Sequence, residues 1–140
     1  MGIVGCGLIG NKRAAALGED ELVGCMDVRA ELAEALAERC GGDACGSLAE
    51  LLSTQPDVVI VATTHDQLAS LAVTALDAGA HVLVEKPAGI SVADVDRIAA
   101  AAGAADRRPL QAGAPQRRAG RQARGGGRWR VPLDLRAAPG

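Results

Sequence analysis

Aromatic residues are almost absent from this 140-residue chain, which contains one Trp and neither Phe nor Tyr. Ala, Leu and Val must therefore fill its core, which indicates an α/β protein. No apolar run approaches the ~20 residues that a membrane span requires, and Met1 is followed by neither a basic segment nor an apolar leader. We expect a cytoplasmic protein with no membrane partner and with one ordinary domain.

The sequence also lacks a CxxC pair. Its four cysteines are Cys6, Cys25, Cys40 and Cys45, and they fall on predicted loop, strand and helix-end positions. Because their spacing is that of neither a zinc site nor a disulfide framework, we expect no metal and reduced, structural thiols. A functional alternative exists for Cys6 alone, which lies in a glycine-rich turn where a thiol would be near bound phosphates.

Three glycines form the central motif of the chain. Gly5, Gly7 and Gly10 make a GxGxxG pattern after a short apolar run and before an alanine-rich segment, an order that is the dinucleotide-binding fingerprint. Gly5 allows a sharp turn, Gly7 lets the backbone approach a pyrophosphate, and Gly10 lets the helix lie against the strand. The N–H groups near Leu8 and Ile9 then face the phosphates at the positive end of the helix dipole. The alternative is a glycine-rich surface loop without a ligand.

An acidic residue follows at the distance that this fingerprint requires. Asp27 ends the strand predicted at residues 21–27 and lies 22 positions after Gly5. A carboxylate there accepts hydrogen bonds from the ribose hydroxyls of the adenosine half and repels a 2′-phosphate, so we expect NAD as the cofactor. Arg29 leaves NADP open, because it can pair with such a phosphate. The alternative is that Asp27 only caps the next helix.

Strand and helix signals alternate along the chain. Continuous apolar runs such as residues 57–62 are typical of parallel strands that are covered on both faces. The pattern predicts an α/β fold, a Rossmann-type doubly wound parallel sheet. Strands are expected at 2–5, 21–27, 57–62 and 80–85, with a further one at 109–112, and helices at 8–17, 30–40, 67–79 and 92–102, with a short one between the capping residue Ser47 and Pro56.

Polar residues follow two of these strands at the carboxyl edge, where open α/β sheets bind ligands. Thr63, Thr64 and His65 follow the strand at 57–62, so they are candidates to line the nicotinamide half of a cleft. In the competing interpretation, Thr64 or Asp66 caps the next helix and His65 is merely exposed.

The strand at 80–85 ends in Glu85, Lys86 and Pro87, at the same edge. Lys86 is expected to project toward the nicotinamide. An ammonium group there can polarise a substrate hydroxyl or ketone and take part in proton transfer, provided that burial lowers its pKa. The alternative is a solvated surface lysine.

These motifs together resemble the Gfo/Idh/MocA family of oxidoreductases. The resemblance covers residues 1 to about 113 and rests on GIVGCGLIG, Asp27, VVIVATT and HVLVEKP. It implies a Rossmann domain that binds NAD or NADP, and reversible oxidation of a secondary alcohol on a sugar, nucleotide sugar or cyclitol. Lys86 falls on the family's EKP lysine, which helps to bind substrate and to relay the proton.

The chain departs from the family in two respects. After the strand at 57–62 the family often has Thr-Pro-Asn-x-x-His, whereas this sequence reads TTHDQL. Family members also have a second domain that forms the substrate site, completes the catalytic set and mediates oligomers. We expect that domain to be absent from this chain, so that the chain binds its cofactor without appreciable turnover.

The last part of the chain differs in composition. Residues 1–106 carry 16 acidic and six basic residues, whereas 107–140 carry nine arginines and one acid. We expect 1–113 to be the NAD(P)-binding domain and 114–140 to be an Arg/Gly/Pro-rich tail, disordered or translated out of frame. One Trp among these arginines is thin support for a nucleic-acid arm.

Two other functions stay open beside the oxidoreductase. The first is a non-catalytic NAD(H)-binding sensor or scaffold whose basic arm binds a partner. The second is another Rossmann enzyme, a relative of homoserine or dihydrodipicolinate reductase, which is disfavoured by Lys86 in its EKP setting.

Overall fold

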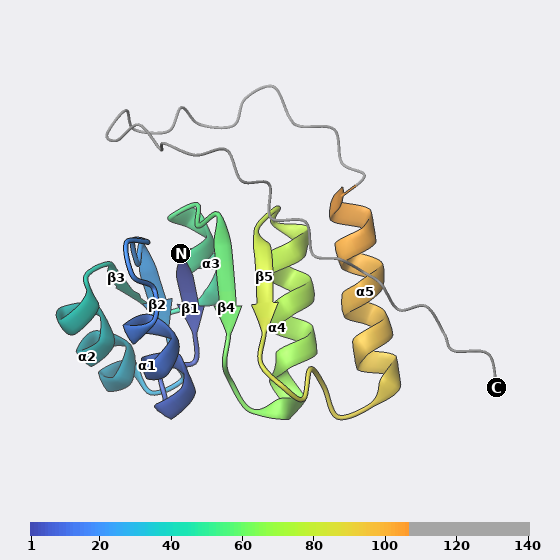
Figure 1. Cartoon of the computed structure of the whole chain (residues 1–140), viewed down its shortest axis with the longest axis horizontal. Helices are drawn as coiled ribbons and strands as arrows, with labels where there is room; N and C mark the ends of the chain where they lie inside the picture. The colour runs from blue at the N-terminus through green and yellow to red at the C-terminus, as the bar shows by residue number, and fades with distance from the viewer. Residues whose placement is uncertain (107–140) are drawn as a thin grey trace, which may run out of the picture. The chain divides into compact units, whose positions relative to one another are not determined.

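The computed structural model describes residues 1–106, which form one parallel five-stranded sheet flanked by helices (Figure 1). The strands lie in the order β3-β2-β1-β4-β5, so the chain starts at the centre, builds one half of the sheet and returns to build the other. This arrangement confirms the predicted Rossmann-type sheet. The strands are β1 (Gly2–Val4), β2 (Gly24–Met26), β3 (Asp43–Cys45), β4 (Val58–Val61) and β5 (His81–Val84), and the helices are α1 (Leu8–Ala15), α2 (Ala30–Cys40), α3 (Leu48–Ser53), α4 (His65–Asp77) and α5 (Val92–Asp106).

The two central strands carry the core. Ile3 of β1 lies opposite Cys25 of β2 and Ile60 of β4, and all three side chains are at most 3% exposed. Successive residues of a strand point to opposite faces, so one apolar stretch supplies two cores. The continuous apolar runs of β1 and β4 are explained by this burial on both faces.

A separate layer of helices covers each face of the sheet (Figure 1). On one face, Ile3 and Ile60 pack against Leu36 of α2 and Ala14 of α1. On the other face, the core includes residues from β1, β4, α3 and α4, among them Val4, Val59, Val61, Leu51, Leu68, Ala72 and Ala75. Small alanine side chains let the helices lie close to the sheet, which is how a core without aromatic residues is filled.

Strand β3 was missed by the sequence analysis. It has three residues, of which only Cys45 is buried, and it is flanked by glycines on both sides. So short and polar a segment carries no strand periodicity of its own. It is a strand because it pairs in parallel with β2, where Gly24 lies opposite Asp43.

The other elements agree with expectation apart from their ends. Helix α4 begins at His65 and not at residue 67, and α5 continues to Asp106 and not to 102. The predicted cap of α3 is confirmed, since the Ser47 hydroxyl accepts a hydrogen bond from the N–H of Glu50 at 3.2 Å. The carboxylate of Glu50 in turn accepts one from the N–H of Gly46 at 2.8 Å, one residue before the N–H that a regular capping box uses.

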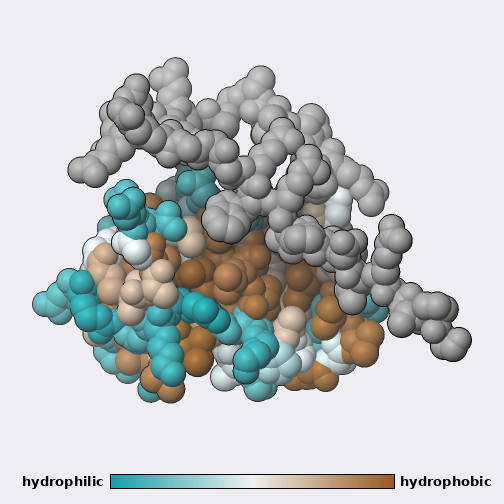
Figure 2. All heavy atoms as spheres, viewed as in Figure 1, coloured by the Kyte–Doolittle hydropathy of each residue, from teal (hydrophilic) through white to brown (hydrophobic). Residues whose placement is uncertain are grey.

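The face of β5 toward α1 is partly exposed. In the view of Figure 1, α4 overlaps this strand and α5 stands beside α4, on the side away from β4. Leu83, which is opposite Ile60, is 42% exposed. On the same view coloured by hydropathy, apolar residues gather in the middle, where β4 and β5 run (Figure 2).

Some predictions lie outside the described residues. They are the strand at 109–112, the domain boundary at residue 113 and the character of the tail at 114–140. Among residues 1–106 no helix combines the length and the apolar character needed to cross a bilayer.

The segment after β1 packs with almost no space between backbones. Gly5 has a φ of +94°, and a Cβ on it would lie 2.4 Å from the carbonyl oxygen of Ala62, just after β4. A Cβ on Gly10 in α1 would lie 1.9 Å from the carbonyl oxygen of Gly5. The predicted roles of these two glycines, a sharp turn and close packing of helix on strand, are both confirmed.

We expect Gly10→Ala to destabilise the domain, because its methyl group meets backbone that cannot move aside. The free energy of unfolding should fall by about 1–3 kcal/mol or more in urea denaturation. Gly7→Ala is the matched control, since a Cβ there meets nothing within 4 Å, and it should cost less than about 1 kcal/mol as a helix-cap change. Equal stability of the two variants would refute this account of Gly10.

Candidate functional site

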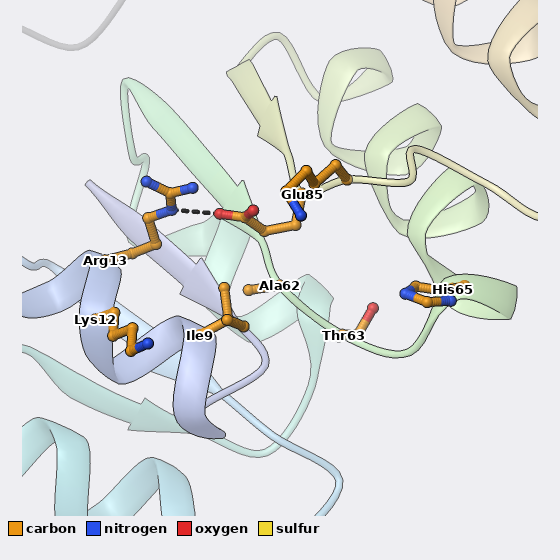
Figure 3. Close-up of a pocket in the computed structure, with 8 residues that line it drawn as sticks. Ile9, Lys12, Arg13, Ala62, Thr63, His65 and Glu85 are labelled. Atoms are coloured by element: carbon orange, nitrogen blue, oxygen red, sulfur yellow. Dashed lines mark hydrogen bonds and ion pairs between the residues drawn. The ribbon is translucent and has the colours of Figure 1, made fainter.

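The carboxyl ends of β1, β4 and β5 meet at one edge of the sheet and surround a pocket. Strand order reverses between β1 and β4, which is where open α/β sheets bind ligands. The pocket has a volume of about 300 Å³. Figure 3 shows Lys12 and Arg13 projecting from α1, Glu85 at the end of β5 and His65 at the start of α4. Its lining consists of Ile9, Lys12, Arg13, Ala62, Thr63, His65, Glu85 and Lys86.

The glycine-rich loop presents free backbone donors beside this pocket. Among residues 1–106, the N–H groups of Gly7, Leu8 and Ile9 donate no hydrogen bond. The Leu8 and Ile9 side chains are 73% and 41% exposed, and the space next to Gly7 is open. Unpaired N–H groups at the start of a helix are suited to bind a phosphate, and the missing Cβ of Gly7 leaves room for it.

Asp27 joins the end of β2 to this loop. One carboxylate oxygen accepts a hydrogen bond from the N–H of Cys6 at 2.7 Å, and the other accepts one from the N–H of Arg29 at 2.9 Å. The position before α2 is occupied by Arg29, whose side chain is exposed, and Asp27 makes no bond to the first turn of that helix. Asp27 is therefore not the N-cap residue of α2, although one of its oxygens binds the backbone of the N-cap residue Arg29.

Arg13 and Glu85 form an ion pair in the lining of the pocket (Figure 3). The Glu85 side chain is 13% exposed, and the hydrogen bond from Arg13 is the main reason why the pKa of Glu85 is lowered from its ordinary value. The same contact raises the pKa of the Arg13 guanidinium. Glu85 is therefore a carboxylate at neutral pH, and it ties α1 to the end of β5.

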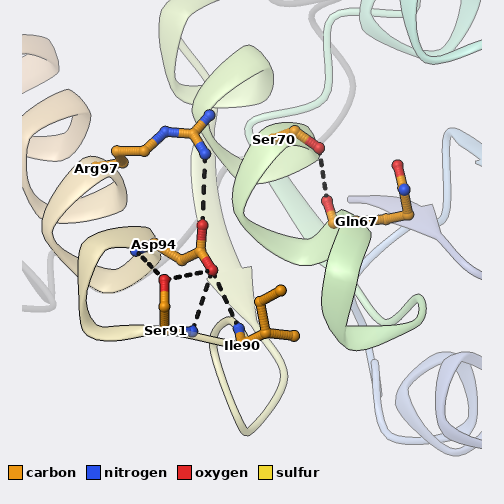
Figure 4. A network of polar contacts seen from close by, with 6 residues as sticks. All are labelled: Gln67, Ser70, Ile90, Ser91, Asp94 and Arg97. Carbon is orange, nitrogen blue, oxygen red and sulfur yellow. Dashed lines mark hydrogen bonds and ion pairs between the residues drawn. The ribbon is translucent and has the colours of Figure 1, made fainter.

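Lys86 lies on an exposed turn whose far end is anchored by α5. Ser91 and Asp94 exchange hydrogen bonds at the start of that helix: the hydroxyl of Ser91 accepts from the N–H of Asp94 at 3.3 Å, and Asp94 accepts from the N–H of Ser91 at 3.2 Å (Figure 4). Asp94 also accepts from the N–H of Ile90 at 3.1 Å. Lys86 lines the pocket, and among the described residues it forms no ion pair within 4.0 Å.

The three polar residues after β4 occupy different environments. Thr63 and His65 line the pocket, with His65 exposed at the first position of α4. Thr64 takes the N-cap position of that helix, but its side chain makes no capping hydrogen bond. The structure thus brings Thr63 and His65 together with Glu85 and Lys86.

The side chain of Cys6, a residue of the glycine-rich loop, is buried beneath the loop backbone. Its thiol donates to the carbonyl of Met26 at 3.4 Å, and its pKa is raised to about 12, mainly by burial and then by Cys25 and Asp27. All four cysteines are free. The Cys6 side chain is therefore a neutral thiol at physiological pH, next to donors that suit an anion.

Sequence reasoning missed several residues of this site. Lys12, Arg13 and Ala62 line the pocket, and the Asn11 side chain bonds to the glycine-rich loop. Lys12 and Arg13 follow Ile9 at helical spacings of three and four, so they lie on the same helix face. That spacing was available in the sequence, whereas the bonds of Asn11 depend on how the loop folds.

The fold, the glycine-rich loop with free donors and the acid at the end of β2 together define a dinucleotide-binding domain. The family model for the oxidoreductase family GFO_IDH_MocA, NAD-binding Rossmann fold, matches residues 1–113. The chain belongs to this family and is an NAD(P)-binding oxidoreductase domain.

Solved structures of dehydrogenases and reductases resemble the described fold. UDP-N-acetylglucosamine 3-dehydrogenase GnnA from Acidithiobacillus ferrooxidans is 28% identical, with a TM-score of 0.71, 75% of this chain covered and 35% of GnnA. The WlbA dehydrogenase from Bordetella pertussis, solved with NADH and UDP-GlcNAcA, is 29% identical (TM-score 0.70; 75% and 33% covered). KijD10, a 3-ketoreductase from Actinomadura kijaniata solved with NADP, is 30% identical (TM-score 0.67; 74% and 34% covered).

This chain thus spans about a third of the length of these solved relatives. No curated protein matches it.

The Arg13–Glu85 pair should make stability depend on pH. Because the folded pKa of Glu85 is lowered from about 4.5, its contribution is present above that value and is lost as the pH falls through the folded pKa. The melting temperature of the wild type should exceed that of Glu85→Gln at neutral pH, and the difference should vanish in acid. Arg13→Ala should show the same loss, and the double variant should lose no more; additive losses would contradict the pairing.

Proposed function

We propose that this chain is the cofactor-binding part of an NAD(P)-dependent oxidoreductase that acts on a secondary alcohol of a sugar, nucleotide sugar or cyclitol. The observation that carries the proposal is the pocket at the carboxyl edge, which has free loop donors on one side and Lys86 on the other. The solved relatives named for UDP-N-acetylglucosamine and bound to UDP-GlcNAcA support the sugar class.

The loop after β1 would hold the pyrophosphate of the cofactor. The N–H groups of Gly7, Leu8 and Ile9 are free to donate to phosphate oxygens, and the dipole of α1 favours negative charge there. Gly5 and Gly10 contribute indirectly, because they allow the turn and the close packing that place these donors.

Asp27 would bind the adenosine ribose and favour NAD over NADP. Each of its oxygens accepts one backbone hydrogen bond, and a carboxylate oxygen has a second lone pair for a ribose hydroxyl. The pair of backbone bonds fixes the position of the charge, so a 2′-phosphate would meet a carboxylate that cannot turn away. Arg29 is exposed beside it and would offset part of that repulsion.

The nicotinamide would lie near Thr63, Thr64, His65, Glu85 and Lys86. The cofactor supplies the acceptor or donor of hydride, and the chain supplies the proton chemistry. Lys86 is the candidate catalytic residue, because an ammonium group at the mouth of the pocket can donate a hydrogen bond to a substrate hydroxyl or ketone and exchange its proton with it. Glu85, bound to Arg13, keeps the start of this turn fixed.

We expect the wild-type chain to bind NADH at least tenfold more tightly than NADPH in parallel calorimetric titrations, about 1.4 kcal/mol, because of the Asp27 charge. Asp27→Asn should narrow that ratio, since it removes the charge and keeps the shape. Glu34→Gln, which removes one exposed charge on α2, is the control and should leave the ratio unchanged. An equal or smaller effect of Asp27→Asn than of Glu34→Gln would count against this role.

We also expect binding without turnover, since this chain matches only about a third of the length of the solved relatives and Lys86, which lines its pocket, is exposed. The 140-residue chain should neither reduce NAD when it is given UDP-sugars, hexoses or inositols nor oxidise NADH when it is given their keto forms, as followed by NADH absorbance. Steady turnover with any of them would contradict this proposal.

A further inference from the structure

Asn11 is a polar residue of α1 that the pocket does not use. Its side-chain amide nitrogen donates to two consecutive carbonyls of the glycine-rich loop, that of Cys6 at 2.6 Å and that of Gly7 at 2.9 Å. Its amide oxygen accepts a hydrogen bond from the guanidinium of Arg39 in the last turn of α2. The half-buried Asn11 thus connects the loop with both helices on this face of the sheet.

These bonds determine where the loop donors point. In a trans peptide the C=O and the N–H point in opposite directions. Since the Cys6 and Gly7 carbonyls are turned toward Asn11, the N–H groups of the same two peptides, on Gly7 and Leu8, are turned away from it. They are two of the free donors described above.

The loop needs such a restraint because glycine backbones can adopt many conformations. Rotation of either peptide plane would present a carbonyl oxygen where the N–H now lies. A carbonyl dipole facing a phosphate repels it, so a single rotation would replace an attraction with a repulsion. The side chain of Asn11 opposes that rotation at both planes, and at the Gly7 carbonyl the backbone N–H of Asn11 adds a hydrogen bond of 3.0 Å. The Cys6 carbonyl has only the side-chain bond.

Arg39 determines the orientation of the Asn11 side-chain amide, that is, which side its oxygen and its nitrogen face. A guanidinium has only donors, so it can bind only the amide oxygen, and the amide nitrogen then faces the two carbonyls. With the amide reversed, oxygen would meet two carbonyl oxygens and nitrogen would meet Arg39. Every polar atom of Asn11 is therefore matched in one orientation only.

We propose that Asn11, oriented by Arg39, is a positioning residue for the pyrophosphate of the cofactor: it holds the Cys6 and Gly7 carbonyls away from the ligand and so aims the N–H groups of Gly7 and Leu8 at it. This inference rests on the proposed function, because it assumes that the glycine-rich loop binds the pyrophosphate.

Three substitutions of Asn11 separate positioning from packing. Asn11→Ala removes both side-chain bonds, keeps the backbone bond to the Gly7 carbonyl and should weaken NADH binding about tenfold in calorimetry, ~1.4 kcal/mol. Asn11→Ser is close to alanine in size, but its hydroxyl can donate to the carbonyl four residues earlier, that of Gly7. It should recover part of the affinity. Asn11→Asp keeps the shape without a donor and adds negative charge, so it should bind most weakly.

The outcomes are distinct for the two proposals. Absence of NADH binding by the wild-type chain would refute the proposed function. Wild-type binding together with unchanged affinity in Asn11→Ala, or an equal loss in Asn11→Ala and Asn11→Ser, would refute the positioning role alone. Melting temperatures of all variants are measured alongside, and titrations are run well below the lowest of them, so that a loss of folding is not taken for a loss of binding.

Arg39 has its own test. Arg39→Gln keeps a side-chain N–H donor without the charge, whereas Arg39→Ala has neither. If Arg39 acts through Asn11, glutamine should retain more NADH affinity than alanine, and the loss in Arg39→Ala should persist at high salt. Equal losses that disappear at high salt would show that Arg39 attracts the phosphates directly, and would overturn its part in the proposal.

Discussion

The close approach of three backbone segments around Gly5 is the constraint on which the rest of the site depends. The end of β1, the start of α1 and the residue after β4 meet there, with room for no Cβ on Gly5 or Gly10. Because these contacts are between backbones, no side chain can adjust to relieve them. They fix the start of α1 against the sheet, and with it the loop donors, Arg13 and the wall of the pocket.

Around this constraint, polar contacts hold the site together from several sides. Asp27 binds the N–H of Cys6 from β2, and Asn11 binds the carbonyl of the same residue from α1. The backbone N–H and C=O of Cys6 are thus both hydrogen-bonded within the protein, while the N–H groups of the next residues, from Gly7 on, remain free. The thiol of Cys6 below adds no charge, since burial raises its pKa to about 12. The thiol therefore places no negative charge beneath the donors that an anion would meet.

The parts of the structure that follow a known sequence pattern could be predicted from the sequence alone. Apolar runs gave β1, β4 and β5, and the spacing of Gly5, Gly7, Gly10 and Asp27 gave the dinucleotide fold that the family match confirms. Strand β3 escaped because its identity comes from pairing with β2 and not from its own three residues. The Arg13–Glu85 pair joins residues 72 positions apart, and no local pattern predicts such a contact. The roles of the individual site residues in binding and catalysis stay predictions.

The turn that carries Lys86 is attached at both ends, by Glu85 to Arg13 and by Ile90 and Ser91 to Asp94. The backbone entropy of that turn is therefore given up when the domain folds, before any ligand arrives. A ligand that reaches Lys86 has only the freedom of the side chain to restrict. The turn is in this sense preorganised, so less of the free energy of binding would be spent on ordering it.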